Sequence, residues 1–304
     1  MVFGQGINKR AVIFIVATAL QLAAKAAAPD VVPLTFINGL PFVHVTVGAA
    51  PTLLMLDSGG ALGISLPEAT VAKAGSVTLT DHKTRFSDLS GNVFEVQDLV
   101  ADHVVVGATR LDQINGRIHT QWGGAPEGPE AELTKARQAG AMGLGAFGNR
   151  SLMFDYGQRT LTIFEPGEGP QANDPEWQTL QLDYGKEGPH VTLLVGGKAL
   201  KFVLDTGAQV NLVNPEALGP APEAQSCERP TAQDEGCDPR LLPDVRDTGG
   251  HPLGAMKAER VKLNGAPFDG ILGASFFATH RVVFDLIAHR LLIAPLQVNS
   301  ESRQ

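Results

Sequence analysis

Two short motifs in this chain place an aspartate directly after an apolar run. Asp57-Ser58-Gly59 follows LLML, and Asp205-Thr206-Gly207 follows KFVL. Two carboxyl groups held about 3 Å apart do not both ionise readily, so such a pair retains one proton near neutral pH. The ionised group can take a proton from a bound water while the protonated group donates a hydrogen bond to a carbonyl oxygen. Because a close pair titrates as a unit, the sequence assigns neither role to one residue.

A third copy of the motif shows that the tripeptide alone is a weak signal. Asp247-Thr248-Gly249 follows the polar stretch LLPDVR rather than an apolar strand. Asp, Thr and Gly all favour turns. We therefore interpret this copy as a turn, with His251 beside it exposed to solvent. Asp155 and Asp285, each the second member of a Phe-Asp pair, are interpreted as turn residues at strand ends.

The elements that would position the two aspartates occur twice in the chain. Residues 41–69 resemble residues 189–217, and each reads as strand, Gly turn, strand ending in Leu-Asp, loop, short strand and Pro-Glu-Ala. A second block, residues 142–166, resembles residues 271–295. The repetition predicts a duplicated unit in which each half supplies one aspartate.

The pattern within each half is typical of β structure. Apolar residues alternate along the expected strands, and the many glycines and prolines suit short strands joined by tight turns. Short helices are expected after Pro67 and Pro215, because proline suits the first turn of a helix. A longer helix is expected at 129–140. We predict an all-β protein made of two β-barrel lobes with a cleft between them.

This organisation predicts the following boundaries along the chain. They are a signal peptide at 1–26, an N-terminal lobe at 29–166 with an insertion at about 112–140, a linker at 167–177, a C-terminal lobe at 178–297 and a tail at 298–304.

The repeated elements resemble a known family. The strand–Asp-Thr-Gly–strand element, the later Ile271-Leu272-Gly273 and the Phe-Asp closing strands are similar to aspartic peptidases of the pepsin and retroviral-protease group. The short lobes look more like a bacterial-type fusion of two retropepsin-like units than a full pepsin. The resemblance covers roughly residues 33–297 apart from the insertion. It implies that Asp57 and Asp205 meet at the lobe junction as the catalytic pair.

The resemblance also implies roles for the neighbouring residues. The hydroxyl groups of Ser58 and Thr206 would brace the two loops against each other. Gly59 and Gly207 would let backbone N–H groups approach the carboxyl groups. Each half also predicts a hairpin with a glycine at its tip, Gly91 in the first half and Gly250 in the second. These hairpins are either flaps that cover the substrate or merely turns, and a single flap at residues 86–96 is favoured over two.

The first half departs from the family pattern in two places. Gly60 stands where the family more often has Ala, Ser or Thr, and Gly143-Leu144-Gly145 looks like a looser version of Ile271-Leu272-Gly273. The missing side chain at Gly60 removes no proton-transferring group. If one half has lost catalytic competence, the first half is the one to suspect.

Composition and missing motifs exclude several other classes of protein. The chain has a formal net charge of −8 and no basic tract in its sequence, which argues against a nucleic-acid partner. The eight histidines include no His-Glu-x-x-His pair, so a zinc peptidase is not expected. No Gly-x-Ser-x-Gly element indicates a serine hydrolase. We expect no metal and no organic cofactor.

The N-terminal segment and the two cysteines indicate where the protein is located. A basic start, a short apolar run and small residues before residue 27 are typical of a secretory signal, with an uncleaved membrane anchor as the alternative. Export to the periplasm or the extracellular space would allow Cys227 and Cys237 to form a disulfide; two free thiols are the alternative.

The leading hypothesis from the sequence is a monomeric, exported aspartic endopeptidase that binds an extended polypeptide substrate between its lobes. The departure at Gly60 keeps open a non-catalytic peptide- or protein-binding module on the same fold. A structural β protein without a site is the third alternative.

Overall fold

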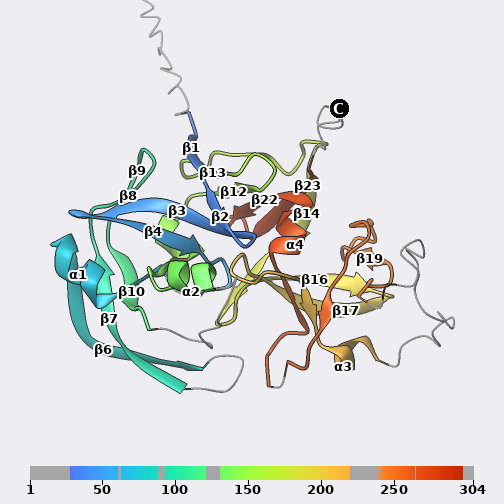
Figure 1. Ribbon diagram of the computed structural model, residues 1–304. Helices are drawn as coiled ribbons and strands as arrows, with labels where there is room; N and C mark the ends of the chain where they lie inside the picture. The colour runs from blue at the N-terminus through green and yellow to red at the C-terminus, as the bar shows by residue number, and fades with distance from the viewer. Residues whose placement is uncertain are drawn as a thin grey trace, which may run out of the picture.

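The computed structural model describes residues 28–60, 63–87, 93–120, 131–219, 238, 240–263 and 265–296. These residues form three β-sheets with a few short helices. The first half of the chain lies on one side of Figure 1 and the second half on the other, with strands from both between them. The prediction of a two-lobed, mostly β architecture is confirmed.

The first half builds one large sheet. Its strands, in spatial order, are β6 (Val77–Ser87), β7 (Val93–Ala101), β10 (Ile114–Ile118), β5 (Ile64–Leu66), β11 (Ala141–Met142), β4 (Ala50–Leu56), β3 (Leu40–Val47), β8 (Val104–Val106) and β9 (Thr109–Leu111), with β2 (Thr35–Ile37) paired to β3.

The second half builds a smaller sheet. Its strands are β15 (Asp183–Gly185), β16 (Gly188–Val195), β17 (Lys198–Leu204), β21 (Gly270–Leu272), β18 (Leu212–Val213) and β20 (Glu259–Arg260), with β19 (Val245–Arg246) paired to β16.

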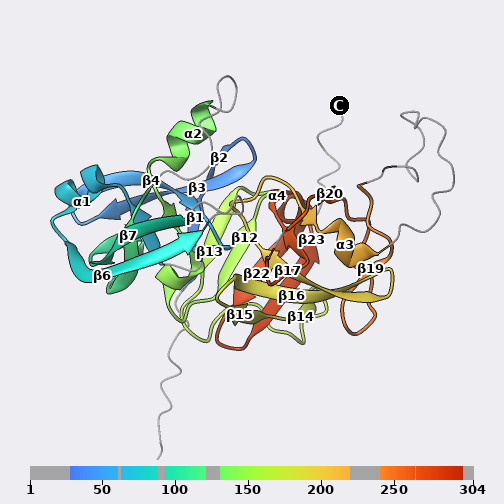
Figure 2. The same ribbon diagram turned by 90° about the horizontal axis from the view of Figure 1, so that it is seen from below.

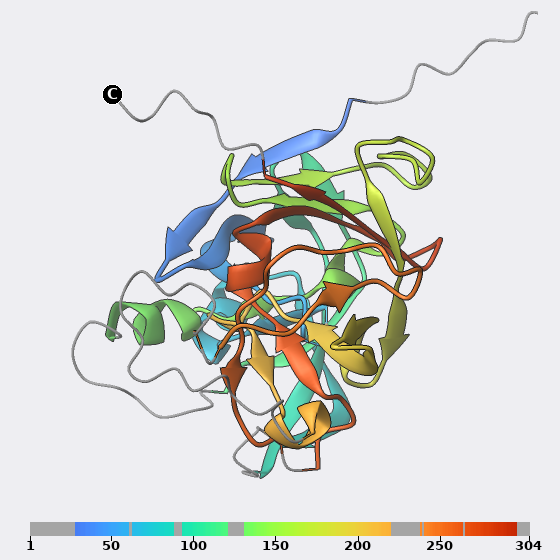
Figure 3. The same cartoon turned by 90° about the vertical axis from the view of Figure 1, so that its right-hand side faces the viewer.

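A third sheet joins the two halves, and Figure 3 shows its early and late strands side by side. Its order is β1 (Asp30–Pro33), β13 (Thr160–Ile163), β12 (Leu152–Asp155), β22 (His280–Asp285), β23 (Arg290–Pro295) and β14 (Gln178–Gln181). The buried rings of Phe154 and Phe284 contact each other across this sheet at 5.7 Å between centroids. The junction between the halves is therefore a shared hydrophobic core with continuous backbone pairing.

The helices are short. They are α1 (Glu68–Ala74), α2 (Ala131–Arg137), the 3₁₀ helix η1 (Leu144–Phe147), α3 (Pro215–Leu218) and α4 (Ala274–Phe277).

Three of these helices were expected from the sequence. Pro67 is the N-cap of α1, and Pro215 is the first residue of α3, whose N-cap Asn214 accepts a hydrogen bond from the backbone N–H of Glu216. Helix α2 occupies part of the predicted 129–140 range. It projects from the first half beside β2 in Figure 2, anchored by buried Leu133.

The hairpins that lead to the two aspartates are closed by glycines in left-handed conformations. Gly48 joins β3 to β4 with φ of +53°, and a Cβ there would lie 2.1 Å from the carbonyl oxygen of Ala74. Gly196 and Gly197, with φ of +56° and +82°, join β16 to β17. Residues with a side chain rarely adopt these angles, so the glycines fix both turns.

Strand pairing is equivalent beside the two aspartates. Met142 of β11 pairs with Leu56 of β4 in parallel, and Leu272 of β21 pairs with Leu204 of β17 in parallel. The structural counterpart of Ile271-Leu272-Gly273 is therefore Ala141-Met142-Gly143. The sequence comparison that matched Ile271-Leu272-Gly273 to Gly143-Leu144-Gly145 was wrong, because it placed the apolar strand residues of the first half two positions too late.

The two halves differ in their hairpins. Strands β6 and β7 form a long antiparallel hairpin in which Phe86 pairs with Phe94. Its predicted tip, Gly91, lies outside the described residues. The corresponding segment of the second half has only the two-residue β19 and single bridges such as Arg246 to Pro252. Proline lacks a backbone donor and interrupts a ladder, so no comparable hairpin is seen in the described part of that segment.

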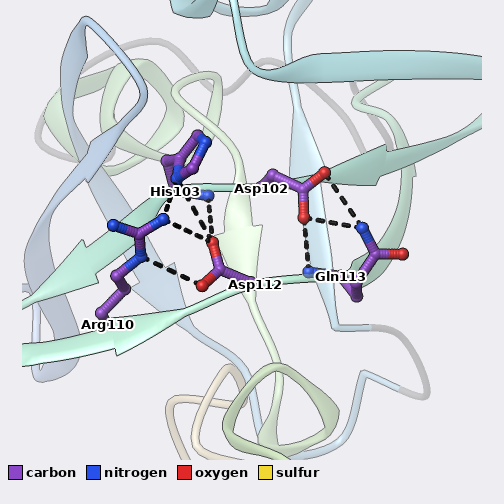
Figure 4. Close-up of polar contacts among 5 residues, drawn as sticks. All are labelled: Asp102, His103, Arg110, Asp112 and Gln113. Carbon is purple, nitrogen blue, oxygen red and sulfur yellow. Dashed lines mark hydrogen bonds and ion pairs between the residues drawn. The ribbon is translucent and has the colours of Figure 1, made fainter.

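Two aspartate-capped turns precede β10, as Figure 4 shows. The Asp102 carboxylate accepts a hydrogen bond from the backbone N–H of Gln113 at 2.8 Å, and the Asp112 carboxylate accepts one from the N–H of His103 at 2.8 Å. His103 and Gln113 both have positive φ, which these bonds stabilise. Each turn thus fixes the other, and together they set where β10 begins.

Several predicted boundaries remain predictions. Strand β10 lies inside the predicted insertion at about 112–140, yet it pairs in parallel with β5 as β20 pairs with β18. The signal peptide, Cys227, Cys237 and the tail lie outside the described residues. In the part of the chain that is described, no helix has the length and apolarity needed to span a bilayer.

Candidate active site

The structure brings Asp57 and Asp205 together. Each follows the end of an apolar strand, and the backbone N–H of Asp57 donates to Met142 at 3.0 Å as that of Asp205 donates to Leu272 at 2.9 Å. The two carboxyl groups face the same point, because a Cβ on Gly207 would lie 3.1 Å from Asp205 Oδ1 and 3.2 Å from Asp57 Oδ1, and each carboxyl group shifts the pKa of the other. Both residues are only half-buried, so this carboxyl pair remains in contact with solvent.

Ser58 and Thr206 form a reciprocal hydrogen-bond network beneath the pair. The N–H of Ser58 donates to Thr206 Oγ1 and the N–H of Thr206 donates to Ser58 Oγ, both at 3.0 Å. Ser58 Oγ donates to the Leu204 carbonyl at 2.8 Å, and Thr206 Oγ1 donates to the Leu56 carbonyl at 2.7 Å. Both side chains are buried. Because every donor has an acceptor, this network holds the two loops in a fixed relation.

The glycines contribute differently in the two loops. The N–H of Gly207 donates to Asp205 Oδ1 at 2.8 Å, as expected, but in the first loop the donor is Gly60, at 2.9 Å from Asp57 Oδ1. Gly59 has another role. A Cβ on Gly59 would lie 2.6 Å from Asp205 Cγ, so a side chain there would displace the partner carboxyl group.

Burial raises the pKa of both aspartates. For Asp205 the pKa rises to about 8, because burial and then the charge of Asp57 disfavour its ionised form while the N–H of Gly207 opposes the rise. For Asp57 burial again dominates, but the hydrogen bond from Asp205, the N–H of Gly60 and two arginines favour the ionised form. The pair therefore retains one proton at neutral pH, with the negative charge favoured on Asp57.

The two arginines, Arg117 of β10 and Arg137 of α2, were not identified from the sequence. Both lower the pKa of Asp57 through their charge. Arg137 also crosses to the second half, where its Nη2 donates to the carbonyl oxygen of Gly207 at 3.1 Å. The available signal was weak, because Arg117 lies between strand residues in INGRI and Arg137 is one of several charges on a helix.

The second half approaches the Asp57 loop from another direction. Gly188, with φ of +94°, is so close that a Cβ there would lie 3.0 Å from the carbonyl oxygen of Gly59. Tyr184 on the adjacent β15 has its pKa raised by burial and then by the charge of Asp57. Residues from both halves therefore surround this carboxyl group.

The three aspartates that were interpreted as turn residues, Asp155, Asp247 and Asp285, do accept hydrogen bonds within local turns. Asp247 accepts hydrogen bonds from the N–H of His251 at 2.9 Å and from Gln178 Nε2 at 2.8 Å. His251 itself is 74% exposed in its side chain. The carboxylates of Asp155 and Asp285 accept hydrogen bonds from backbone N–H groups three residues later.

A cavity of about 370 Å³ in the second half is lined by residues that include Asn211, Met256, Phe276 and His280, but not by the aspartate pair. Among the described residues, no group of three or more His, Cys, Asp or Glu side chains is arranged to hold a metal ion.

Comparison with known proteins identifies the fold. No protein-family model and no curated protein matches the chain in sequence. Among solved structures, the chain is similar to the crystal structure of aspartic proteinase from Irpex lacteus, with a TM-score of 0.59 and 14% identity. The match covers 91% of this chain and 100% of that one. The chain has the two-lobed pepsin-like fold.

At this identity the likeness establishes the pepsin-like fold alone, and the chemistry must be argued from the residues. The arrangement contains two adjacent carboxyl groups with solvent contact, a shared proton and a rigid hydrogen-bonded support. In chemical terms it can act as a combined general base and general acid on a water molecule placed between the carboxyl groups.

Proposed function

We propose that this protein is an aspartic endopeptidase that hydrolyses peptide bonds with water activated between Asp57 and Asp205. The observation that carries the proposal is the close approach of these two carboxyl groups on loops joined by Ser58 and Thr206: a Cβ on Gly207 would lie 3.1 Å from Asp205 Oδ1 and 3.2 Å from Asp57 Oδ1. Carboxyl groups are not brought into contact without cost, because two adjacent carboxyl groups cannot both ionise readily. Such perturbed pairs are concentrated at functional sites.

The charges around the pair favour a division of labour. The guanidinium groups of Arg117 and Arg137 stabilise the ionised form of Asp57, which takes a proton from the attacking water. Asp205 retains the proton and donates a hydrogen bond to the scissile carbonyl oxygen. Water attacks the carbonyl carbon directly, and the proton taken by Asp57 passes to the leaving nitrogen as the C–N bond breaks.

The departure at Gly60 does not weaken this proposal. The N–H of Gly60 supplies a hydrogen bond to the Asp57 carboxylate, and a Cβ at this position would lie 3.2 Å from Asp57 Oδ2. Glycine thus leaves room for the carboxyl group. The first half retains both a carboxylate and its backbone donor.

The remaining parts of the proposal follow from the chain itself. Both aspartates belong to one polypeptide, so a monomer supplies a complete pair, as in a fusion of two retropepsin-like units. We propose that an extended polypeptide binds across both halves through backbone hydrogen bonds. We further propose that the protein is exported, on the basis of its first 26 residues.

The test is cleavage of an unbiased peptide mixture by Asp57→Asn and Asp205→Asn variants. Each substitution keeps the size of the side chain but removes the ability to share the proton. We expect each to abolish cleavage, by at least about a thousandfold in kcat/KM, while circular dichroism and thermal unfolding show a folded protein.

Asp247→Asn is the matched control, because it alters the third copy of the motif outside the carboxyl pair. It should leave the cleavage rate unchanged once the fraction folded is taken into account. Full cleavage by Asp205→Asn would refute the proposal. Peptide binding without cleavage by the wild type, across the pH range, would instead favour the non-catalytic binding module.

A further inference from the structure

Arg117 lies on a strand that is tied to the first aspartate loop. Strand β10 pairs in parallel with β5, the strand that follows Asp57, so that Arg117 is in register with Ser65. The start of β10 is fixed by the paired turns at Asp102 and Asp112 drawn in Figure 4. Arg117 is therefore held at a defined position near Asp57 rather than on a loose loop.

The guanidinium group of Arg117 lies over an aromatic ring. Its Cζ is 3.9 Å from the centroid of Phe86 on β6, and Phe86 stacks on Phe94 of β7 at 5.2 Å. Stacking on an aromatic ring orients the plane of a guanidinium group and leaves its edge donors available. The arginine is thus pre-oriented on one side by two stacked rings.

No acidic partner takes up these donors. Among the described residues, no carboxylate lies within ion-pair distance of Arg117, although Asp98 is directly opposite on β7. Most arginines of the described chain differ in this respect. Ion pairs are formed by Arg110, Arg150, Arg240, Arg246, Arg281 and Arg290.

Arg137 provides the sharper contrast. Its Nη2 already donates to the Gly207 carbonyl, so this guanidinium group has a structural partner in the second half. Arg117 is half-buried and oriented, yet its guanidinium group makes no hydrogen bond with the described residues. A half-buried arginine in this condition is suited to a carboxylate that arrives with a ligand, because a guanidinium group binds carboxylates through two parallel hydrogen bonds.

We infer that Arg117 is a specificity-determining residue that binds the carboxylate of an aspartate or glutamate side chain in the substrate, close to the scissile bond on the side of the first half. This inference rests on the proposed function. It does not follow from the overall charge of the protein, which is −8 and would repel acidic peptides. The preference is therefore local to the stacked arginine.

The experiment has two stages. First, the wild-type protein digests an unbiased peptide mixture, and mass spectrometry identifies the residues on each side of every cleaved bond. We expect acidic residues to be enriched at one position. Second, peptides that differ only by Glu or Gln at that position are compared by kcat/KM, and we expect the Glu peptide to be favoured by about tenfold or more.

Arg117→Met removes the charge but keeps an apolar side chain against Phe86. The Glu/Gln ratio should fall to within about twofold of one, because only the Glu peptide loses a charge partner, whereas the effect of the missing charge on Asp57 changes kcat/KM for both peptides alike. Arg117→Lys, which retains the charge without the planar donors, should give an intermediate ratio. Arg85→Met is the matched control, since Arg85 precedes Phe86 on the same strand, is exposed and points to the opposite face.

The outcomes separate this inference from the function on which it rests. Cleavage without acidic enrichment, or a Glu/Gln ratio unchanged in Arg117→Met, overturns the inference and leaves the proposed function standing. Equal loss of both peptides in a folded Arg117→Met variant makes the arginine structural and also overturns it. If the wild type cleaves no peptide at all, the proposed function fails first.

Discussion

The loops that carry Asp57 and Asp205 have similar bonding but different surroundings. Each aspartate follows an apolar strand, donates its N–H to an equivalent carbonyl on a neighbouring strand and accepts a backbone hydrogen bond within its own loop. Around Asp57, however, the structure places two arginines, whereas the main causes of the shift of the Asp205 pKa among the described residues include no cation.

This difference shows how a nearly symmetric scaffold can support an asymmetric pair. Hydrogen bonding by Ser58 and Thr206 fixes the geometry equally for both halves, since each residue supplies the same two bonds. The hydrogen bonds from Asp205 and Gly60, and then the charges of the two arginines, favour the negative charge on Asp57. Geometry and charge are set by different elements, so substitutions can test them separately.

The largest expected effect tests the symmetry of the support. Ser58→Ala and Thr206→Val each remove one hydroxyl group and leave a buried N–H and a buried carbonyl without their partners. We expect each to lower the free energy of unfolding by about 2–4 kcal/mol. Denaturant unfolding measures this, with Thr206→Ser as a control that keeps the hydroxyl group. A large loss in only one of the two variants would show that the halves are not equally braced.

The next effect tests how tightly the loops enclose the carboxyl groups. A Cβ at position 59 would lie 2.6 Å from Asp205 Cγ, whereas one at position 207 would lie 3.1 Å from Asp205 Oδ1. Gly59→Ala should therefore reduce kcat/KM by about a hundredfold, because it displaces a reacting group. Gly207→Ala should reduce it less. Kinetics on a cleaved peptide with both variants would decide, and the reverse order would contradict the described packing.

A smaller effect concerns stability and pH. The pKa of Asp205 is raised from 3.8 to about 8 in the folded state, so the folded protein binds a proton that the unfolded chain has released. The stabilisation from this proton is complete below about pH 4 and is lost as the pH rises through about 8. Asp205→Asn should therefore stabilise the protein at pH 7 by about 1–2 kcal/mol, a range reduced for the solvent contact of the carboxyl group.

Thermal unfolding at pH 4 and pH 7 measures this difference. The Asn variant and the wild type should unfold at similar temperatures at the lower pH, while the variant should be more stable at the higher pH. Asp247→Asn, in the turn at the third motif, should not show this pattern. Burial raises the pKa of Asp247, but the hydrogen bonds from Gln178 and His251 outweigh it and hold this pKa below its usual value. A wild type that gains stability between pH 4 and pH 7 relative to Asp205→Asn would contradict the raised pKa.

Much of the scaffold could be predicted because it is encoded locally. Apolar strands, glycine turns and the prolines at positions 67 and 215 act within a few residues, so the hairpins and short helices could be predicted. Ser58 and Thr206 were found through their motif. Their hydrogen bonds join two loops that lie 148 positions apart in the sequence, yet both residues could be found because each belongs to an Asp-Ser/Thr-Gly motif.

The rest depends on contacts that no local pattern reveals. Arg117 reaches Asp57 because β10 inserts between β5 and β7, although β10 lies in a range that was predicted to be an insertion. Arg137 contacts Gly207 only because its side chain, at the end of α2, reaches across to the second half. The short β19 differs from the long β6–β7 hairpin because proline and glycine limit its pairing. The sequence comparison treated the two segments as equivalent and so did not reveal this difference.

The smallest expected effect isolates the charge asymmetry. Arg137→Met removes one of the two cations that lower the pKa of Asp57, so this pKa should rise. The acid limb of the pH profile of kcat/KM, which reports ionisation of the free carboxyl pair, should move to higher pH, while the basic limb changes less. Arg137→Lys retains the charge and should keep the acid limb near its wild-type position. A shift of equal size in both variants would mean that the hydrogen bond to Gly207, rather than the charge, controls the pair. In that case the two loops would differ in how they are held and not in their electrostatics.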